Sequence, residues 1–162
     1  MALEMELPVL LINIERAAAR RALIEGQAAE LGITLERVAG VDGSLVPQEN
    51  WADVDLGLFR NRNGRPMMAG EYGCYRSHIN AFRHLVASGR KAALVIEDDV
   101  ALTHDLMQRA TAILQAVPDD CVVKLVNHRT VAFQHRFTSA MGDRIGLSRF
   151  GPQGSSACYL LT

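Results

Sequence analysis

Cysteine is scarce in this sequence. Its 162 residues include three cysteines, Cys74, Cys121 and Cys158, an odd number without a CxxC pair. Such usage gives no support to a disulfide framework or to a cysteine zinc site, because both need closely spaced or paired cysteines. We therefore expect a protein of a reducing compartment, in which Cys74 and Cys158 are small buried side chains rather than nucleophiles.

An excess of charge and a long apolar run are also missing. The formal net charge is −1, which gives the chain no general attraction to nucleic acid or to an anionic membrane. No apolar run approaches the length that spans a bilayer, and no basic region followed by a long apolar segment opens the chain. We expect a cytoplasmic protein that binds no nucleic acid and is at most peripheral at the inner membrane.

Internal repeats, low-complexity tracts and linkers are absent as well. A chain of 162 residues can bury one substantial core, although it is small for an enzyme with two substrates. A hydrophobic content of 49% with a charged content of 22% is ordinary for a soluble globular protein. We therefore expect residues 1–162 to form a single domain.

What the sequence does contain is an alternation of strand-like and helix-like segments. Strands are predicted from apolar runs at residues 8–14, 33–38, 92–96, 121–126 and 156–161. Helices are predicted at 17–31, at a segment whose apolar face is Tyr75, Ile79, Phe82 and Val86, and between an N-cap at Thr103 and Pro118. Residues 44–69 read as a long loop, which Trp51 and Phe59 anchor to the core. The alternative for these two aromatic side chains is a platform on which a sugar stacks.

This alternation predicts an α/β fold with a largely parallel sheet and helices on both faces. In such sheets, ligands bind at the carboxyl ends of the strands. Asn13 and Asp42 both follow predicted strands, and so do the three consecutive carboxylates Glu97, Asp98 and Asp99. We therefore expect these polar residues to meet at one edge of the sheet.

The acidic triplet itself needs an explanation, because like charges at one strand end repel one another and resist burial. In extended backbone, Glu97 and Asp99 point the same way and Asp98 points the opposite way. Their oxygens could then hold Mg²⁺ or Mn²⁺ together with a substrate phosphate. The alternative is an exposed acidic turn before the next helix. The convergence with Asn13 and Asp42 favours the metal site.

Taken together, several stretches resemble glycosyltransferase family 25, the lipooligosaccharide-type galactosyl and glucosyl transferases. The resemblance runs in order over about residues 7–162, and its most specific parts are the Gly-Glu-x-Gly-Cys-x-x-Ser-His stretch and the acidic triplet. The stretches are Leu11-Ile12-Asn13-Ile14-Glu15-Arg16 with Arg20 and Arg21, Val41-Asp42-Gly43, Gly70-Glu71-Tyr72-Gly73-Cys74-Tyr75-Arg76-Ser77-His78, and Val95-Ile96-Glu97-Asp98-Asp99.

The resemblance implies a GT-A-like fold and an inverting transfer of a hexose, galactose or glucose, from a UDP-sugar to a saccharide or glycolipid acceptor of lipopolysaccharide biosynthesis. It also implies that the triplet plays the part of the DxD metal motif, with Asp99 and Glu97 as the ligands of Mn²⁺ or Mg²⁺. The family pattern usually continues beyond Thr162, so the chain reads as C-terminally short. A second subunit of a homo-oligomer would then supply the acceptor half.

Around that metal, we expect five residues to contact the donor. Arg16 and Arg20 would add positive charge near the diphosphate, Asn13 and Asp42 would hydrogen-bond the base and ribose, and Asp98 completes the set. For Arg16 and Arg20 the alternative is a solvated helix face. For Asn13 and Asp42 it is a local turn or cap, for which Asn and Asp are favoured.

Inversion also needs a base that takes the proton of the acceptor hydroxyl. Glu71 and His78 are the candidates, since they lie about two turns apart on one face of a predicted helix. Glu71 could instead stabilise the helix N-terminus, and His78 could be a hydrogen-bonded core histidine. Two other functions fit the same residues: a shortened relative that binds the nucleotide-sugar without transferring it, and a metal-dependent phosphohydrolase.

Overall fold

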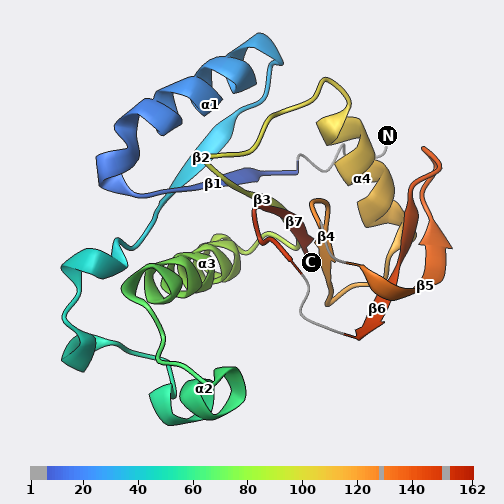
Figure 1. Cartoon of the computed structure of the whole chain (residues 1–162). Coiled ribbons are helices and arrows are strands. Elements are labelled where there is room, and N and C mark those ends of the chain that lie inside the picture. The colour runs from blue at the N-terminus through green and yellow to red at the C-terminus, as the bar shows by residue number, and fades with distance from the viewer. Residues whose placement is uncertain (1–6, 128–129, 151–153) are drawn as a thin grey trace.

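The computed structural model describes residues 7–127, 130–150 and 154–162. Its centre is a five-stranded mixed sheet in the order β2-β1-β3-β7-β4 (Figure 1). The strands are β1 (Val9–Asn13), β2 (Leu35–Ala39), β3 (Ala93–Glu97), β4 (Val122–Lys124) and β7 (Cys158–Leu161). The predicted α/β class and all five predicted strands are confirmed.

The sheet is less uniform than a parallel sheet. β1 pairs in parallel with both β2 and β3, whereas β7 is antiparallel to β3 and to β4. The strands β1 to β4 therefore point one way, and β7 lies among them in the opposite direction. As a result, the start of β7 lies at the same edge as the carboxyl ends of the other strands.

Helices cover both faces of the sheet, as predicted (Figure 1). A short 3-10 turn η1 (Glu15–Ala17) leads into α1 (Ala18–Glu30), which packs with α4 (Leu106–Ala116) against one face. The long helix α3 (Ala69–Ser88) covers the other face. Thr103 is not the N-cap of α4, because Asp105 occupies that position and accepts a hydrogen bond from the Thr103 hydroxyl at 2.8 Å.

Alternation along the strands divides the core between these two layers. Leu94 and Ile96 of β3 face α1 and α4, whereas Ala93 and Val95 face α3. The same alternation directs Glu97, the last residue of β3, toward α3. The side chains at the end of β3 therefore project toward different faces of the sheet.

The face of α3 that packs on the sheet differs from the predicted one. Ser77, Ala81 and Leu85 are buried, whereas Val86 is 80% exposed. Small side chains at the contact let the helix approach the sheet closely, which places the larger apolar residues Tyr75, Ile79 and Phe82 beside the contact. Those three line an open pocket, and Phe82 also packs against the edge of the core.

Residues 44–69 are not a structureless loop. They begin in the 3-10 turn η2 (Gly43–Leu45) and continue through η3 (Gln48–Asn50) and α2 (Leu56–Asn63), which lies beyond the end of α3 and away from the sheet (Figure 1). Trp51 stacks on Tyr72 of α3 with 4.4 Å between ring centroids, so its predicted role as an anchor is confirmed. The stack fixes this segment to α3.

A hairpin was not foreseen from the sequence. Among the described residues, the strands β5 (Val131–Thr138) and β6 (Arg144–Phe150) pair only with each other, in a separate two-stranded sheet. Within the described residues, no helix is both long and apolar enough to cross a membrane.

Candidate functional site

The carboxyl ends of β1 and β3 are adjacent, because β1 lies between β2 and β3 in the sheet. The chain leaves β1 toward β2 on one side and returns to β3 on the other, which is the switch point where ligands of open α/β sheets bind. Asn13 ends β1 and is buried, and its amide Nδ2 donates to Asp98 Oδ2 at 2.6 Å. Sequence positions 85 apart therefore meet as predicted.

Asp98 is held from a second side by a basic residue. Arg20 of α1 lies with Nε 3.2 Å from Asp98 Oδ1, and the carboxylate is only 7% exposed. Asn13 Oδ1 is buried and has no hydrogen-bond partner among the residues that the structure describes. Buried polar atoms are nearly always paired, so this carbonyl oxygen is one that a bound group could satisfy after a small movement.

Arg16 and Asp42 form a second ion pair at the same edge. Asp42 also accepts hydrogen bonds from the Ser44 backbone N–H at 3.1 Å and from its hydroxyl at 2.6 Å. The hydrogen bonds from Ser44 and Arg16 hold the pKa of Asp42 below its usual value. Asp42 therefore has the local capping role that was the alternative to nucleotide binding. It also pairs with Arg16, another of the residues predicted to contact the nucleotide-sugar.

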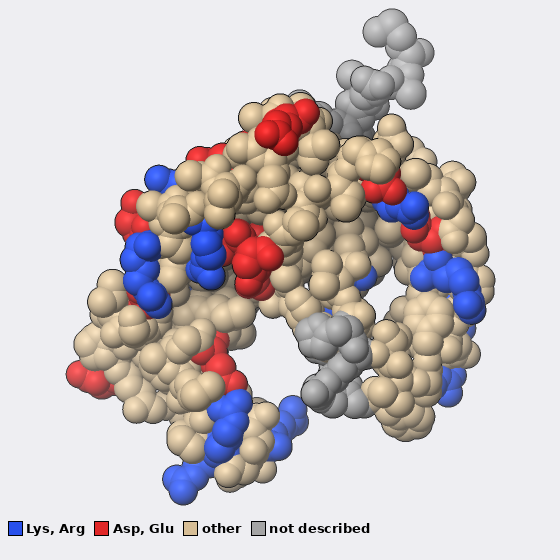
Figure 2. Space-filling model, turned by 45° about the horizontal axis from the view of Figure 1, so that its top comes forward, with Lys and Arg blue, Asp and Glu red and all other residues tan. Residues whose placement is uncertain are grey.

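Figure 2 shows basic and acidic side chains next to one another on one face of the molecule, beside a hollow. Of the predicted donor residues, Asn13, Arg20 and Asp98 form one connected group, and Arg16 with Asp42 forms another. Opposite charges so close together suit a ligand that carries both phosphates and hydroxyls.

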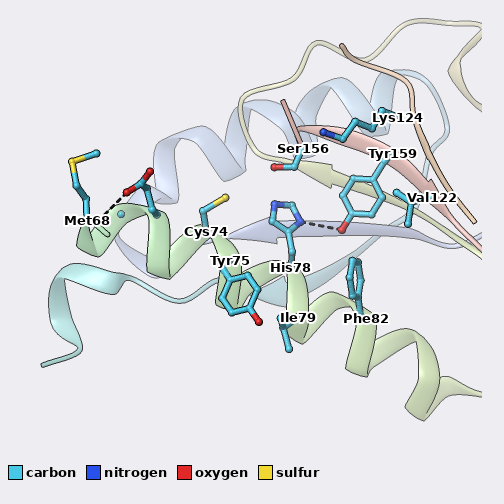
Figure 3. Close-up of a pocket in the computed structure, with 12 residues that line it drawn as sticks. Met68, Cys74, Tyr75, His78, Ile79, Phe82, Val122, Lys124, Ser156 and Tyr159 are labelled. Atoms are coloured by element: carbon cyan, nitrogen blue, oxygen red, sulfur yellow. Dashed lines mark hydrogen bonds between the residues drawn. The ribbon is translucent and has the colours of Figure 1, made fainter. Parts of the chain in front are cut away.

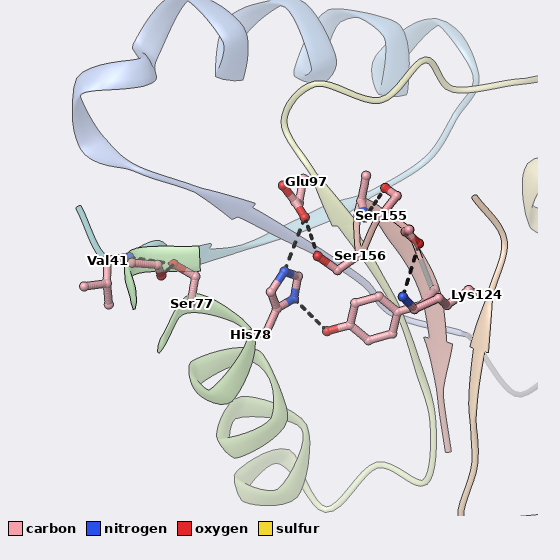
Figure 4. Close-up of polar contacts among 11 residues, drawn as sticks. Val41, Ser77, His78, Glu97, Lys124, Ser155 and Ser156 are labelled. Carbon is pink, nitrogen blue, oxygen red and sulfur yellow. Dashed lines mark hydrogen bonds and ion pairs between the residues drawn. The ribbon is translucent and has the colours of Figure 1, made fainter. Parts of the chain in front are cut away.

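Glu97 lies on the α3 side of the strand end and belongs to a different network (Figure 4). Its Oε1 is 3.3 Å from His78 Nε2 and accepts a hydrogen bond from the Ser156 hydroxyl at 3.1 Å. The other ring nitrogen of His78, Nδ1, lies 3.0 Å from the Tyr159 hydroxyl. Residues of α3, β3 and the start of β7 thus meet around one imidazole.

The charges in this network depend on each other. Burial alone would lower the pKa of His78, but hydrogen bonds and charge from Cys74 and Glu97 outweigh it and raise the pKa to about 9. The hydrogen bond from His78 in turn keeps the pKa of Glu97 below its usual value despite burial. At neutral pH the pair is therefore an imidazolium beside a carboxylate.

Asp99 is exposed, and within the described part of the chain no hydrogen bond or ion pair of Asp99 is seen. The group of potential ligands that the structure brings together is different: Cys74, His78 and Glu97, with one ligand atom of each within 4.8 Å of the others. Glu97 thus belongs to both the predicted metal set and the observed group, whereas the role of Asp99 stays a prediction.

Beside this network is an open pocket of about 710 Å³ (Figure 3). Apolar and aromatic side chains of α3 form one wall, and Val122, Lys124 and Tyr159 form the other. Cys74 projects into the pocket from the same side of α3 as His78 (Figure 3). Cys74 is exposed, so the prediction of a buried side chain is wrong for Cys74 and confirmed for Cys158.

Glu71 lies at the first turn of α3 and is engaged by a cation. Both its oxygens accept hydrogen bonds from Arg65, one of them at 2.7 Å and the other at 2.5 Å. The Met68 backbone N–H donates to Glu71 as well, at 2.9 Å. The hydrogen bond with Arg65 is the main cause that lowers the pKa of Glu71 to about 2. A carboxylate so stabilised is a weak base, and the role of base stays a prediction for Glu71 and His78 alike.

Comparison with known proteins decides the family. A sequence model described as glycosyltransferase family 25 (LPS biosynthesis protein) matches residues 6–145. The chain belongs to glycosyltransferase family 25. The family expected from the motifs is thereby confirmed.

The relatives among curated proteins are much longer than this chain. A "Glycosyltransferase 25 family member" of Aedes aegypti is 30% identical over 110 residues, covering 65% of this chain and 18% of that protein. "Procollagen galactosyltransferase 1" of Danio rerio is 29% identical over 113 residues, covering 67% and 19%. "Probable inactive glycosyltransferase 25 family member 3" of Rattus norvegicus is 29% identical over 113 residues, covering 67% and 20%. The chain spans about a fifth of the length of these relatives.

The fold explains why the family 25 stretch Gly70–His78 contains glycine and serine. Gly73 lies against the turn that carries Asp42, so a Cβ on it would be 2.6 Å from Val41 O. The Ser77 hydroxyl accepts a hydrogen bond from the Val41 N–H at 2.8 Å and donates to Gly73 O at 2.7 Å. These residues position the β2 end against α3, whereas Cys74 and His78 face the site.

Three members of the site were missed from the sequence. Ser156 and Tyr159 reach it because β7 inserts antiparallel beside β3, and no local pattern announces that insertion. Cys74 had a usable signal: it precedes His78 by one helical turn, the spacing that puts two side chains on one face.

Proposed function

We propose that this family 25 chain binds a UDP-hexose, with galactose or glucose as the sugar, at the carboxyl ends of β1 and β3. The observation that carries the proposal is the group Asn13, Arg20 and Asp98, in which a buried amide and a cation flank a carboxylate at the switch point. A nucleotide offers hydrogen-bonding edges, hydroxyls and a diphosphate, and each finds a complementary side chain there.

The carboxylates at the end of β3 suit a divalent cation. Three consecutive carboxylates follow β3, of which Asp99 is exposed and Glu97 is half-buried. Oxygen ligands of this kind suit Mn²⁺ or Mg²⁺, with Asp99 and Glu97 as the residues that would hold it. When bound, the cation would stabilise the charge that grows on the leaving diphosphate. Arg16 and Arg20 would add fixed positive charge on the α1 side.

The acceptor is a saccharide or a glycolipid in this proposal, and the hexose is transferred with inversion. The names of the relatives support a hexose, since three of them are named procollagen galactosyltransferases. The pocket lined by Tyr75, Ile79 and Phe82 adjoins His78 and gives an acceptor apolar surface to contact. Glu71 and His78 stay the two candidates for the base: Glu71 is paired with Arg65, and His78, whose pKa is raised to about 9, would have to lose its proton before it could accept one.

Binding without transfer is a second candidate function. A rat relative bears the name "Probable inactive glycosyltransferase 25 family member 3", and this chain covers 20% of it. A chain of that kind would keep the donor site and lack turnover.

One experiment tests the proposal. UDP-galactose and UDP-glucose are titrated calorimetrically into the protein with and without Mn²⁺, and UDP release is followed in the presence of saccharide acceptors. We expect binding that depends on Mn²⁺ and weakens at least about tenfold in Asp99→Ala, but not in the exposed control Asp119→Ala. Binding without UDP release supports the second candidate. No binding of either UDP-sugar would refute both.

A further inference from the structure

We infer that Cys74, His78 and Glu97 form a site for a borderline-soft divalent cation such as Zn²⁺, with one coordination position open to the pocket. One ligand atom of each residue lies within 4.8 Å of the other two. Three protein ligands with an open fourth position is the common arrangement of zinc sites that bind a further small ligand. The inference concerns these three side chains and does not depend on the proposed function.

The local geometry suits coordination. Cys74 and His78 are one turn apart on α3, so both side chains project from the same side of the helix (Figure 3). Pairs of ligands at this spacing on a helix recur in metal sites. Glu97 approaches from the end of β3, with Oε1 3.3 Å from His78 Nε2. Metal–ligand distances of about 2.0–2.3 Å put neighbouring ligand atoms about 3.3–3.8 Å apart, so only small side-chain movements are needed.

The surroundings of the imidazole also resemble those of a metal ligand. The Tyr159 hydroxyl can accept a hydrogen bond from Nδ1–H, and Nε2, which faces Glu97, is then the nitrogen whose proton a metal ion would displace. Ser156 holds Glu97 Oε1 through its hydroxyl (Figure 4). Partners of this kind orient ligating histidines and carboxylates, and their loss commonly costs about 10–100-fold in metal affinity.

The types of ligand atom indicate which metal ions the site prefers. A thiolate with an imidazole and one carboxylate favours Zn²⁺ or Co²⁺, whereas Mg²⁺ and Mn²⁺ prefer oxygen ligands throughout. This site is therefore different from the oxygen site proposed at Asp99. The two share Glu97, so both cannot use that carboxylate fully at the same time.

The test uses Zn²⁺ and Co²⁺ alone with the whole chain. Zn²⁺ affinity is measured by competition with a chromogenic chelator, and Co²⁺ is added to look for a thiolate-to-cobalt charge-transfer band. We expect one tight site and the band in the unmodified protein. Cys74→Ser should lose the band and weaken Zn²⁺ binding at least about tenfold, as should His78→Gln. The matched controls are Cys121→Ser and His84→Gln, the latter on the same helix, and both should bind as the unmodified protein does.

A second measurement needs no variant and so does not depend on how well one folds. Alkylation of each cysteine by iodoacetamide is followed by peptide mass spectrometry with and without Zn²⁺. The inference expects Zn²⁺ to slow alkylation of Cys74 at least about tenfold and to leave Cys121 unaffected, because a coordinated thiolate is not available to react. Equal alkylation of Cys74 with and without Zn²⁺, or a Co²⁺ complex lacking the thiolate band, would overturn it.

Discussion

Asn13 and Asp98 hold the ends of β1 and β3 together: the buried amide Nδ2 of Asn13 donates to Asp98 Oδ2 at 2.6 Å. Asp98 is therefore stabilised by a fixed donor and by Arg20, at a point where the backbone of both strands ends. The contact joins the ends of the two strands directly through their side chains. Both the stability of the chain and the shape of its candidate donor site depend on it.

Replacement of Asn13 by alanine is the direct test of that contact. Asn13→Ala leaves a buried carboxylate with one donor fewer, which should lower the free energy of unfolding by about 1–3 kcal/mol. Urea denaturation followed by circular dichroism measures the change. Asn63→Ala is the matched control, because its amide donates to Phe59 O at 2.9 Å on the exposed side of α2 and should matter by less than about 0.5 kcal/mol. Equal effects of the two substitutions would contradict the role given to Asn13.

A second prediction concerns the glycines of the Gly70–His78 stretch. A Cβ at position 73 would lie 2.6 Å from Val41 O and 2.7 Å from the Gly43 nitrogen, whereas a Cβ at position 70 would meet nothing within 4 Å. Gly73→Ala should therefore destabilise the chain by about 1–3 kcal/mol through overpacking against backbone. Gly70→Ala should be neutral, or stabilising by up to about 1 kcal/mol. Thermal unfolding of the two variants side by side checks this, and a stable Gly73→Ala would show that the contact can relax.

The part of this site that the sequence predicts is the part that regular strand geometry positions. Asn13 and Asp98 were expected together because the carboxyl ends of parallel strands share an edge, which is a property of the fold class. The opposite directions of Glu97 and Asp98 follow from strand alternation. These relationships depend only on regular backbone geometry, so apolar runs and their end points were enough to predict them.

The rest depended on packing between distant elements. Tyr159 reaches His78 because β7 pairs antiparallel with β3. The direction of β7 depends on how distant strands pair in the sheet, and the local sequence does not indicate it. The buried face of α3 was misjudged since Ser77 and Ala81 pack closely on the sheet, although Ile79 and Phe82 are more hydrophobic. The hairpin β5–β6 buries no continuous stripe, so its alternation gave only a weak signal.

A third prediction uses the pH dependence of stability at Glu71. Its pKa in the folded chain is about 2, below the ordinary value of 4.5, mainly because Arg65 donates to it. A lowered pKa means that the stabilisation is fully present above about pH 4.5 and is lost as the pH falls toward 2. Glu71→Gln should therefore be less stable than the unmodified chain at pH 7, with the difference shrinking through that window.

Arg65→Gln is the control for this effect, because it removes the partner and keeps the carboxylate. It should reduce the same pH-dependent difference, and the double variant should add little to either single one. Unfolding free energies at several pH values between 2 and 7 give the comparison. A difference between Glu71→Gln and the unmodified chain that grows as the pH falls would contradict the assigned sign.

The last prediction concerns Glu97, which belongs to both proposed metal sites. If the oxygen site that supports UDP-sugar binding and the Cys74–His78–Glu97 site share this carboxylate, Zn²⁺ should compete with Mn²⁺-dependent donor binding. At free Zn²⁺ about ten times its own dissociation constant, the apparent affinity for UDP-galactose should fall about tenfold. Calorimetry in a zinc-buffered solution measures this fall. Cys74→Ser should escape the effect, because it weakens the zinc site and leaves Glu97 and Asp99 in place. Donor binding that is unchanged by Zn²⁺, or that Zn²⁺ supports as well as Mn²⁺ does, would show that the two sets do not compete for Glu97.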